Sequence, residues 1–461
     1  MHPRRLAQAL ASSVAMLVLG ASGSVAGAPT TVAAAAPFTT GHAPELVALA
    51  PGVQIDPILT AGDVIGGRTN GYQMTGVPDG LGAYRSSAST IELFMNHELD
   101  KSDGDVANSR VSHLTLDESG AVVAAGYALD GSEGFTCFCS SSLRQLEGAP
   151  WYFTGEECKS GRGGNSIALN AATGRWSRTP QFGRMLHENV VPVPGLDKAT
   201  FVLSEDGNAG RSQLYEYTAG SFARSIRGRG ALRVWVASGH TDRDPSPNDI
   251  KKGETLRGRF VKIPQGRNRD VDSLELAAGR RGAFDFVRIE DSEASRTQPG
   301  VVYFSDTGAA HNDTFQGRVY QLDLDPADPT KASVQVLLDG DHGDDLTQPD
   351  NLATSKDALI IQEDRNYKHS GYDRVLVYSF VDQSLTPVAR ADPTQHVIDT
   401  EGIGNWETSG VISAAKWFGK GWWLLDVEAH DTRVPQPGPS LKVNSRMGEG
   451  GQLLKVYIPG T

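Results

Sequence analysis

The most constraining feature of this sequence is a recurring unit, a short apolar β-type run that ends in acidic residues. Six such runs occur along the chain. Their acidic ends are Glu98, Glu156-Glu157, Glu205-Asp206, Asp306, Glu363-Asp364 and Glu428. Four of the runs are preceded by another acid in a polar turn, some fourteen to twenty-one residues earlier, and these acids are Glu188, Glu290, Asp350 and Glu407.

Other short segments rich in β-branched and aromatic residues fill the intervals, and Gly, Asp, Asn or Pro residues bound them. The sequence shows no long amphipathic helix, and its 52 glycines favour tight turns. A unit that recurs about every 50 to 65 residues is typical of a propeller. The chain is therefore predicted to be all-β and to form a six-bladed β-propeller with insertions. The interval between Asp206 and Asp306 is about twice as long, which leaves room for an extra or enlarged blade.

A propeller also gives the recurring acids a common location. The innermost strands of all blades run along the central channel, so acids at equivalent strand ends converge at one face. Carboxylates that lie a few ångströms apart repel one another unless cations neutralise them. Oxygen-only ligand sets select hard cations, above all Ca²⁺. The repeated pattern therefore predicts several calcium ions, although any one of these acids taken alone would more simply cap a turn.

The N-terminus has the pattern of an export signal. Arg4-Arg5 precede an apolar run that gives way to small residues, which is typical of a cleaved signal peptide. We expect a signal peptide over residues 1–28, a flexible segment over 29–45 and one propeller domain over 46–461. The protein is then secreted, by the Sec or the Tat route. No later run is long and apolar enough to span a membrane, and we expect a monomer.

Charge and cysteine content narrow the partners and the compartment. The net charge of −12 argues against nucleic acid as a partner, because phosphate backbones need a basic surface. The three cysteines are Cys137, Cys139 and Cys158. In an exported protein one disulfide to Cys158 is expected, from either Cys137 or Cys139, which leaves one thiol as a buried group or a metal ligand.

Six motifs in this order resemble the PhoX-type alkaline phosphatase family. They are "NHELD", Cys139-Ser with "PWYFTGEE", "HENV" with "VLSED", "RIED" with "VVYFSDTG" and "GRVYQLDLD", "QPDNL" with "IIQED", and "NWE" with "DVEAH". The resemblance covers about residue 50 to the end of the chain. It implies an exported β-propeller that hydrolyses small phosphate monoesters with calcium and a pair of iron ions (Fe³⁺), held by carboxylates and one thiolate.

Carried over motif by motif, the resemblance implies a set of metal ligands: Cys139, Glu98, Glu157, Glu188, Glu290, Asp350 and Glu407. Glu188, Arg184 and His187 are the candidate catalytic residues. Further candidates for binding phosphate or moving protons stand beside the motifs, and these are Lys159, Arg162, Arg365, His97 and His430. Three features depart from the family: Cys139 is followed by "SSSLRQLEGAPW" rather than Gly-Gly, Cys158 follows the acid pair rather than preceding it, and His187 stands where Arg is common.

Two other functions fit the same sequence. A calcium-dependent propeller hydrolase of another specificity (phytase-like, phosphodiesterase or lactonase) would need the carboxylates but not the thiolate. A non-catalytic propeller stabilised by calcium would bind a partner or a cell-envelope polymer instead. The sequence contains no Gly-x-Ser-x-Gly elbow, P-loop, His-Glu-x-x-His motif or dinucleotide-binding fingerprint.

Overall fold

Antiparallel β-strands dominate the computed structural model of this chain. It describes residues 30–67, 71–101, 106–158, 163–207, 211–239, 250–309, 314–365, 371–392, 406–430, 433–435, 441–443 and 447–461. The signal peptide expected over residues 1–28 lies outside these ranges. Among the described residues, no helix is long and apolar enough to cross a lipid bilayer.

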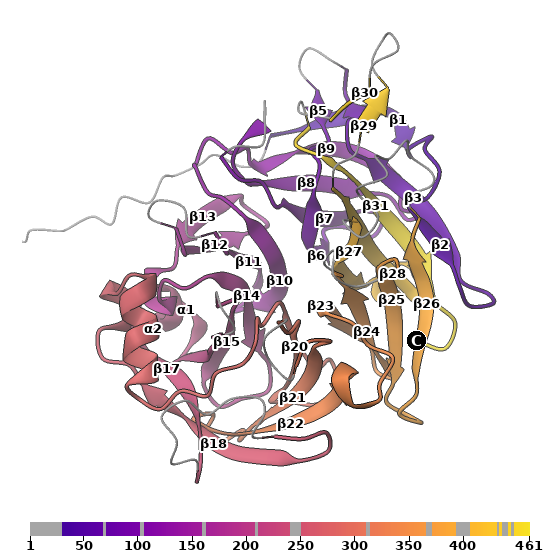
Figure 1. Ribbon diagram of the computed structural model, residues 1–461. Helices are drawn as coiled ribbons and strands as arrows, with labels where there is room; N and C mark the ends of the chain where they lie inside the picture. The colour runs from indigo at the N-terminus through magenta and orange to yellow at the C-terminus, as the bar shows by residue number, and fades with distance from the viewer. Residues whose placement is uncertain are drawn as a thin grey trace, which may run out of the picture.

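Four separate sheets form blades around a common centre (Figure 1). The first has the order β1 (Thr30–Phe38), β9 (Val122–Leu129), β8 (Arg110–Leu116), β7 (Ile91–His97) and β6 (Pro78–Arg85). The second runs from β10 (Phe138–Leu146) through β11 (Ala149–Glu156) and β12 (Ser166–Asn170) to β13 (Arg175–Arg178). The third comprises β2 (Leu46–Ala48), β26 (Leu385–Ala391), β25 (Arg374–Ser379), β24 (Ala358–Glu363) and β23 (Pro349–Thr354). The fourth comprises β27 (Trp406–Ser413), β28 (Trp422–Ala429), β31 (Gly450–Tyr457) and β3 (Gln54–Thr60).

The fifth sheet has nine strands. Its order is β14 (His187–Val193), β15 (Ala199–Glu205), β16 (Leu214–Ala219), β17 (Gly230–Ala237), β18 (Thr255–Lys262), β22 (Lys331–Asp339), β21 (Arg318–Leu324), β20 (Val301–Asp306) and β19 (Ser292–Ala294). The two end strands, β14 and β19, contact each other, so this sheet nearly closes on itself. The all-β class and the propeller-like arrangement are therefore confirmed, whereas the number of six blades stays a prediction.

The remaining elements are short. Two pairs of strands stand apart from the large sheets, β4 (Val64–Ile65) with β5 (Tyr72–Gln73) and β29 (Arg433–Pro435) with β30 (Leu441–Val443). The α-helices are α1 (Phe222–Ile226), α2 (Val271–Gly279) and α3 (Ala415–Phe418). The 3₁₀ helices are η2 (Pro180–Phe182), η4 (Gly266–Asn268) and η5 (Gly340–His342).

Apolar side chains between neighbouring sheets form the core. Phe94 of β7, for example, packs against Tyr152 of β11, and both side chains are fully buried. Between the third and fourth sheets, Ile360 and Val375 belong to one cluster with Trp423 and other residues of β28. Burial of such side chains is the main favourable term in folding, and it holds the blades in fixed positions around the channel.

The two ends of the chain are joined in one sheet. Near the N-terminus, β3 pairs antiparallel with β31 near the C-terminus, which closes the ring as expected for a propeller. The segment predicted to be flexible over residues 29–45 differs from that expectation, because Thr30–Phe38 forms β1 and pairs with β9. The exposed edge of β9 offers unpaired backbone groups, and an extended Ala/Thr segment satisfies them without needing a strong apolar pattern.

Candidate metal centre

Strands from all parts of the chain begin at one end of the central channel. Contacts join β6 to β10, β10 to β14, β14 to β19, β19 to β23, β23 to β27 and β27 to β6, which makes a closed ring. Each of these strands carries an acid or a cysteine at or just before its start. These residues are Asp79, Cys139, Glu188, Glu290, Asp350 and Glu407.

In five of the six pairs, the second strand contributes a further acid to the same end. Antiparallel pairing places the end of one strand opposite the start of its neighbour, as in the pairs His187–Glu205, Pro349–Glu363 and Glu407–Glu428. The acids found at or just after these strand ends are Glu98, Glu157, Asp206, Asp364 and Glu428. We call the two sets together the carboxylate cluster. It contains all seven residues predicted as metal ligands, and metal binding by them stays a prediction.

Several groups of three within the cluster are close enough to share an ion. The candidate ligand atoms of each group lie within 4.8 Å of one another. The groups are Asp79, Glu98 and Cys139; Cys139, Glu157 and Glu188; Glu157, Asp206 and Glu290; and Glu407, Glu428 and His430. Cys139 and Glu157 each belong to two of these groups, so neighbouring sites would share ligands.

Burial and mutual repulsion dominate the electrostatics of the carboxylate cluster. Burial, followed by the charges of Glu157, Glu290 and Asp350, raises the pKa of Glu188 well above its ordinary value. The pKa of Glu407 is raised in the same way, by burial and then by Glu428, Asp364 and Asp350. These shifts are what closely packed carboxylates show when no cation neutralises them.

Unsatisfied oxygens support the same conclusion. Oε2 of Glu188, Oδ1 of Asp206 and both carboxylate oxygens of Asp426 are buried and accept no hydrogen bond from any described residue. A buried carboxylate oxygen without a partner is costly, and cation coordination is the usual compensation. The donor set is mainly carboxylate with one thiol, so its chemistry fits hard cations such as Ca²⁺ together with a metal that accepts a thiolate.

The structure selects one of the two disulfides that the sequence left open. Cys137 pairs with Cys158, and the Cα atoms are 5.4 Å apart. Cys139 remains a free, buried cysteine, and its Sγ lies 3.1 Å from Oε2 of Glu157. Burial, and then the charges of Glu98, Glu188 and Glu157, raises the pKa of the Cys139 thiol. A nearby cation would reverse that effect, because metal coordination deprotonates thiols.

Arg288 brings a positive charge to the carboxylate cluster. Its Nη2 lies 2.6 Å from Oε1 of Glu290 and 3.1 Å from Oδ2 of Asp206. The Arg288 side chain keeps 34% of its surface exposed, so the guanidinium is accessible to solvent while it forms ion pairs with the two acids. Arg288 was not among the candidates predicted from the sequence, although it stands two positions before Glu290 in the "RIED" motif.

The three motif histidines occupy different environments. His97 is fully buried between the carbonyl of Gly76 and the hydroxyl of Ser112, so it has a structural role. His430 contacts the cluster, with Nε2 3.0 Å from Glu428 and Nδ1 2.8 Å from Glu449. Burial alone would lower the pKa of His430, but the hydrogen bonds to these two carboxylates outweigh it and raise the pKa.

The candidate catalytic residues beside Glu188 are not brought into the cluster by any described contact. His187 is fully buried, its Nε2 lies 3.2 Å from the carbonyl of Gly183, and burial lowers its pKa to about 4. The described electrostatic contact of Arg184 is with Asp270 at the start of α2. Catalytic roles for His187 and Arg184 therefore stay predictions: His187 is packed in the core, and Arg184 acts electrostatically on Asp270. Lys159 and Arg162 lie outside the described residues.

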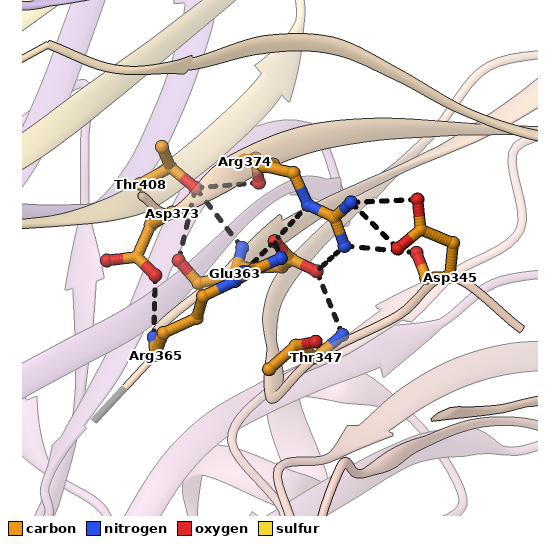
Figure 2. A network of polar contacts seen from close by, with 7 residues as sticks. All are labelled: Asp345, Thr347, Glu363, Arg365, Asp373, Arg374 and Thr408. Carbon is orange, nitrogen blue, oxygen red and sulfur yellow. Dashed lines mark hydrogen bonds and ion pairs between the residues drawn. The ribbon is translucent and has the colours of Figure 1, made fainter. Parts of the chain in front are cut away.

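A hydrogen-bonded network fixes two of the cluster strands (Figure 2). Glu363 at the end of β24 accepts charge-assisted hydrogen bonds from Arg365 and Arg374, with the nearest nitrogens at 2.9 and 2.7 Å. The backbone amide of Glu363 also donates to Oγ1 of Thr408 on β27. Asp364 directly follows Glu363 in the chain, and Glu407 directly precedes Thr408. The network therefore holds both acids in place. Arg365 is thus engaged with Glu363 rather than held as a free phosphate-binding group.

Asp79 is a cluster residue that the sequence analysis did not select. Asp79 follows Pro78 and stands nineteen residues before Glu98. This separation lies within the fourteen to twenty-one residues that separate the turn acids from the strand-end acids in the other runs. The Pro-Asp pair also matches Pro349-Asp350. The signal was therefore present, but the run before Glu98 contains a second acid, Glu92, which obscured it.

The fold and the site define a class: a propeller-like all-β protein with a carboxylate–thiol cluster at one end of its central channel. No protein-family model matches the sequence, and no curated protein sequence is similar to it at a significant level. Among solved structures, it is similar to PhoX of Pseudomonas fluorescens in complex with vanadate, a transition state analogue. The TM-score is 0.59 at 12% identity, over 94% of this chain and 98% of that chain. A sialidase of Trypanosoma rangeli in complex with sialic acid also matches, with a TM-score of 0.41 at 12% identity, over 89% of this chain and 60% of that chain. The chain thus has a PhoX-like fold.

Proposed function

We propose that this protein is an exported, metal-dependent phosphomonoesterase that acts on small phosphate esters. The observation that carries the proposal is the convergence of one acid or cysteine from each of six strand starts, with acids from neighbouring strand ends, on a PhoX-like fold. Vanadate, which is bound in that PhoX structure, mimics the five-coordinate geometry of phosphoryl transfer, and this is consistent with the same chemistry here.

The residues of the cluster divide between two kinds of metal. We propose that calcium is held by carboxylates alone, as in the group of Glu157, Asp206 and Glu290, because hard cations prefer oxygen ligands. The groups that contain Cys139 would hold the proposed iron pair, since thiolates favour transition metals. When bound, such cations neutralise phosphate oxygens and activate a nucleophile.

The residues of the chain itself would position the ester. Arg288 has its guanidinium against Asp206 and Glu290 and is partly exposed, so it is the candidate for hydrogen bonding to phosphate oxygens. It would replace the arginine that the family commonly has where His187 stands here. Arginine suits this role because its planar fork donates two parallel hydrogen bonds to a phosphate. His430, held between Glu428 and Glu449, would keep its proton close to the cluster.

We also propose six blades and an extracellular location. The nine-stranded sheet would represent two blades, β14–β17 and β19–β22, joined through the extra strand β18. The closed ring of six innermost strands supports this count. Export is supported by the signal-like N-terminus and by the Cys137–Cys158 disulfide, because disulfides persist in oxidising compartments.

The test is release of p-nitrophenol from p-nitrophenyl phosphate by the full-length mature protein at alkaline pH. The assay is run with calcium, after chelation, and after calcium is added back, with metal analysis of the same samples. We expect activity that disappears on chelation and returns with the metals, and none from a Glu188→Gln variant. An Asp325→Asn variant, changed in an exposed turn, serves as the matched control.

Two outcomes would redirect the proposal. Hydrolysis of bis-p-nitrophenyl phosphate or of a lactone, without hydrolysis of the monoester, would favour a calcium-dependent propeller hydrolase of another specificity. Absence of turnover in a protein that binds calcium and melts at a higher temperature with it would favour a non-catalytic propeller stabilised by calcium.

A further inference from the structure

The central channel contains a cavity of about 640 Å³ beyond the carboxylate cluster. The strands that surround the channel all start at the cluster, so residues late in these strands lie at the opposite end. Arg85 is the last residue of β6, and Arg144 stands near the end of β10. Arg296 follows β19, and Lys416 lies in α3 after β27. All four line the cavity, so it opens away from the cluster.

A belt of polar residues separates the cavity from the carboxylate cluster. Nδ2 of Asn351 donates to Oγ of Ser140 at 2.7 Å, and the amide of Gly410 donates to Oδ1 of Asn351 at 3.0 Å. Nδ2 of Asn189 donates to Oδ1 of Asp291 at 2.6 Å. Each of these five residues lines the cavity. Because these five residues are hydrogen-bonded to one another in two groups, they form the inner end of the cavity rather than part of the proposed metal sites.

Positive charge is in excess at the outer end of the cavity. Arg144 lies 2.7 Å from Oε2 of Glu293, and Arg296 lies 3.7 Å from Oε1 of the same carboxylate. Both side chains are only partly buried, with 24% and 27% of their surface exposed, respectively. Lys416 forms no ion pair with a described residue, and within the described part of the chain the Arg85 side chain hydrogen bonds to the carbonyl of Ala88 alone. One glutamate therefore pairs with two partly buried arginines, and Arg85 and Lys416 add two further positive charges at the cavity.

This imbalance has a physical consequence. Burial lowers the pKa of Arg296, Glu293 raises it, and the neighbouring Arg144 lowers it further, so the two guanidinium groups repel each other. The Arg296 guanidinium makes no hydrogen bond to a described residue, although it carries five donor hydrogens. Charge that is partly removed from water without a full set of partners is unfavourable, and an anion that enters the cavity would compensate it.

We propose that this cavity is a second binding site, for a hydroxylated anion about the size of an acidic or phosphorylated monosaccharide. Its anionic group would pair with Arg144 and Arg296, which present planar forks to a carboxylate, phosphate or sulfate. Its hydroxyls would meet the polar belt and the unpaired backbone edges of the innermost strands. The cavity volume is in the range of small-molecule sites. The site is independent of metal binding and of phosphatase activity in the carboxylate cluster.

The test is isothermal titration calorimetry of the calcium-loaded full-length mature protein. Glucuronate and glucose 6-sulfate are the probes, because neither is a phosphate monoester, and glucose is the neutral control. We expect saturable binding of at least one anion and none of glucose. Preference for glucuronate would indicate a sugar acid as the natural ligand, and preference for glucose 6-sulfate would indicate a phosphorylated sugar.

Variants with opposite expected effects separate binding from folding. Arg296→Gln should weaken the anion about tenfold or more, because it removes a charge-assisted pair. Glu293→Gln should tighten binding several-fold, since it releases both arginines from their shared carboxylate. Lys356→Ala, an exposed lysine outside the cavity, is the matched control and should change nothing. If Arg296→Gln fails to fold, Lys416→Ala takes its place, with a smaller loss of affinity expected.

Three results would overturn the proposal. They are the absence of saturable binding to either anion, binding that is unaffected by all three cavity variants, and binding that is lost in Glu188→Gln but retained in Arg296→Gln. The last result would place the anion in the carboxylate cluster. The phosphatase assay measures turnover at the other end of the channel, so its outcome neither supports nor weakens this site.

Discussion

The Sγ atom of Cys139 lies 3.1 Å from Oε2 of Glu157, while the neighbouring Cys137 is locked in a disulfide with Cys158. The disulfide therefore ties the start of β10 to the chain just beyond β11, next to the free thiol. Cys139 and Glu157 come from these two adjacent segments, so the covalent link fixes the distance between them. The charges of four acids act on this thiol, those of Glu98, Glu188, Glu157 and Asp79, and a bound cation would favour its thiolate form.

The Cys139→Ser variant tests whether the thiol is a metal ligand. Serine is similar in size but cannot supply the proposed thiolate ligand, so we expect loss of iron and retention of calcium. Activity toward p-nitrophenyl phosphate should fall at least about tenfold, as expected for damage to a metal's ligand shell. The measurement is metal content per chain alongside turnover. Full activity in Cys139→Ser would show that the thiolate has no role in catalysis.

Glu188→Gln should lower stability only when metal is bound. In chelator, the change removes a buried carboxylate whose pKa is raised by burial and by its acidic neighbours, so the melting temperature should hold or rise. In the metal-loaded protein, it removes a proposed metal ligand and should lower stability by about 0.5–3 kcal/mol. Thermal denaturation under both conditions measures the effect. A loss of the same size in chelator and in the metal-loaded protein would mean that Glu188 is not a metal ligand.

The Arg288→Lys variant tests whether Arg288 hydrogen bonds to the phosphate group of the substrate. Lysine keeps the positive charge beside Glu290 and Asp206 but loses the planar fork. We expect kcat/KM for the monoester to fall about tenfold or more, with weaker competitive inhibition by vanadate. The Tm in calcium should change little, because the charge balance is kept. Unchanged inhibition by vanadate would exclude contact between Arg288 and the phosphoryl group.

The strand pattern and the convergence of acids were predictable from the sequence because both follow from local rules. Apolar runs of the right length bounded by turn residues give strands, and equivalent strand ends meet in a propeller. For this reason Glu98, Glu188, Asp350 and Glu407, chosen by position alone, lie in one cluster. The propeller-like arrangement followed from the spacing of the same acids.

Features that depend on tertiary contacts were not predictable in this way. The pairing of β1 with β9 depends on an exposed sheet edge, and the position of Arg288 between Asp206 and Glu290 depends on how two distant segments pack. Spacing alone did not decide whether Cys137 or Cys139 pairs with Cys158, because the two candidates are only two residues apart. No sequence pattern predicts that Arg144 and Arg296 line the same cavity, because the two residues stand far apart in the chain.

The disulfide should contribute to stability without contributing to metal binding. Its cysteines are 21 residues apart, and closing a loop of that length stabilises the folded state by about 3 kcal/mol in the chain-entropy model. A Cys137→Ala/Cys158→Ala variant should therefore melt at a lower temperature than the wild type but keep its calcium content. Denaturation with and without reductant provides the measurement, and the variant itself should be insensitive to reductant. Equal melting temperatures for variant and wild type would contradict the expectation.

Asp306 gives a pH-dependent prediction outside the carboxylate cluster. Burial raises its pKa to about 8, although the amide of Val287 and the charge of Arg318 partly oppose the shift. A carboxyl group with a raised pKa in the folded state favours folding when protonated, so its contribution is lost as the pH rises from about 4 to about 8. Asp306→Asn keeps an acceptor for the Val287 amide and cannot ionise. The variant should match the wild type near pH 4 and exceed it above pH 8, by at most about 5 kcal/mol. Urea denaturation across this range measures the difference, and parallel curves for the two proteins would show that Asp306 stays ionised in the folded state.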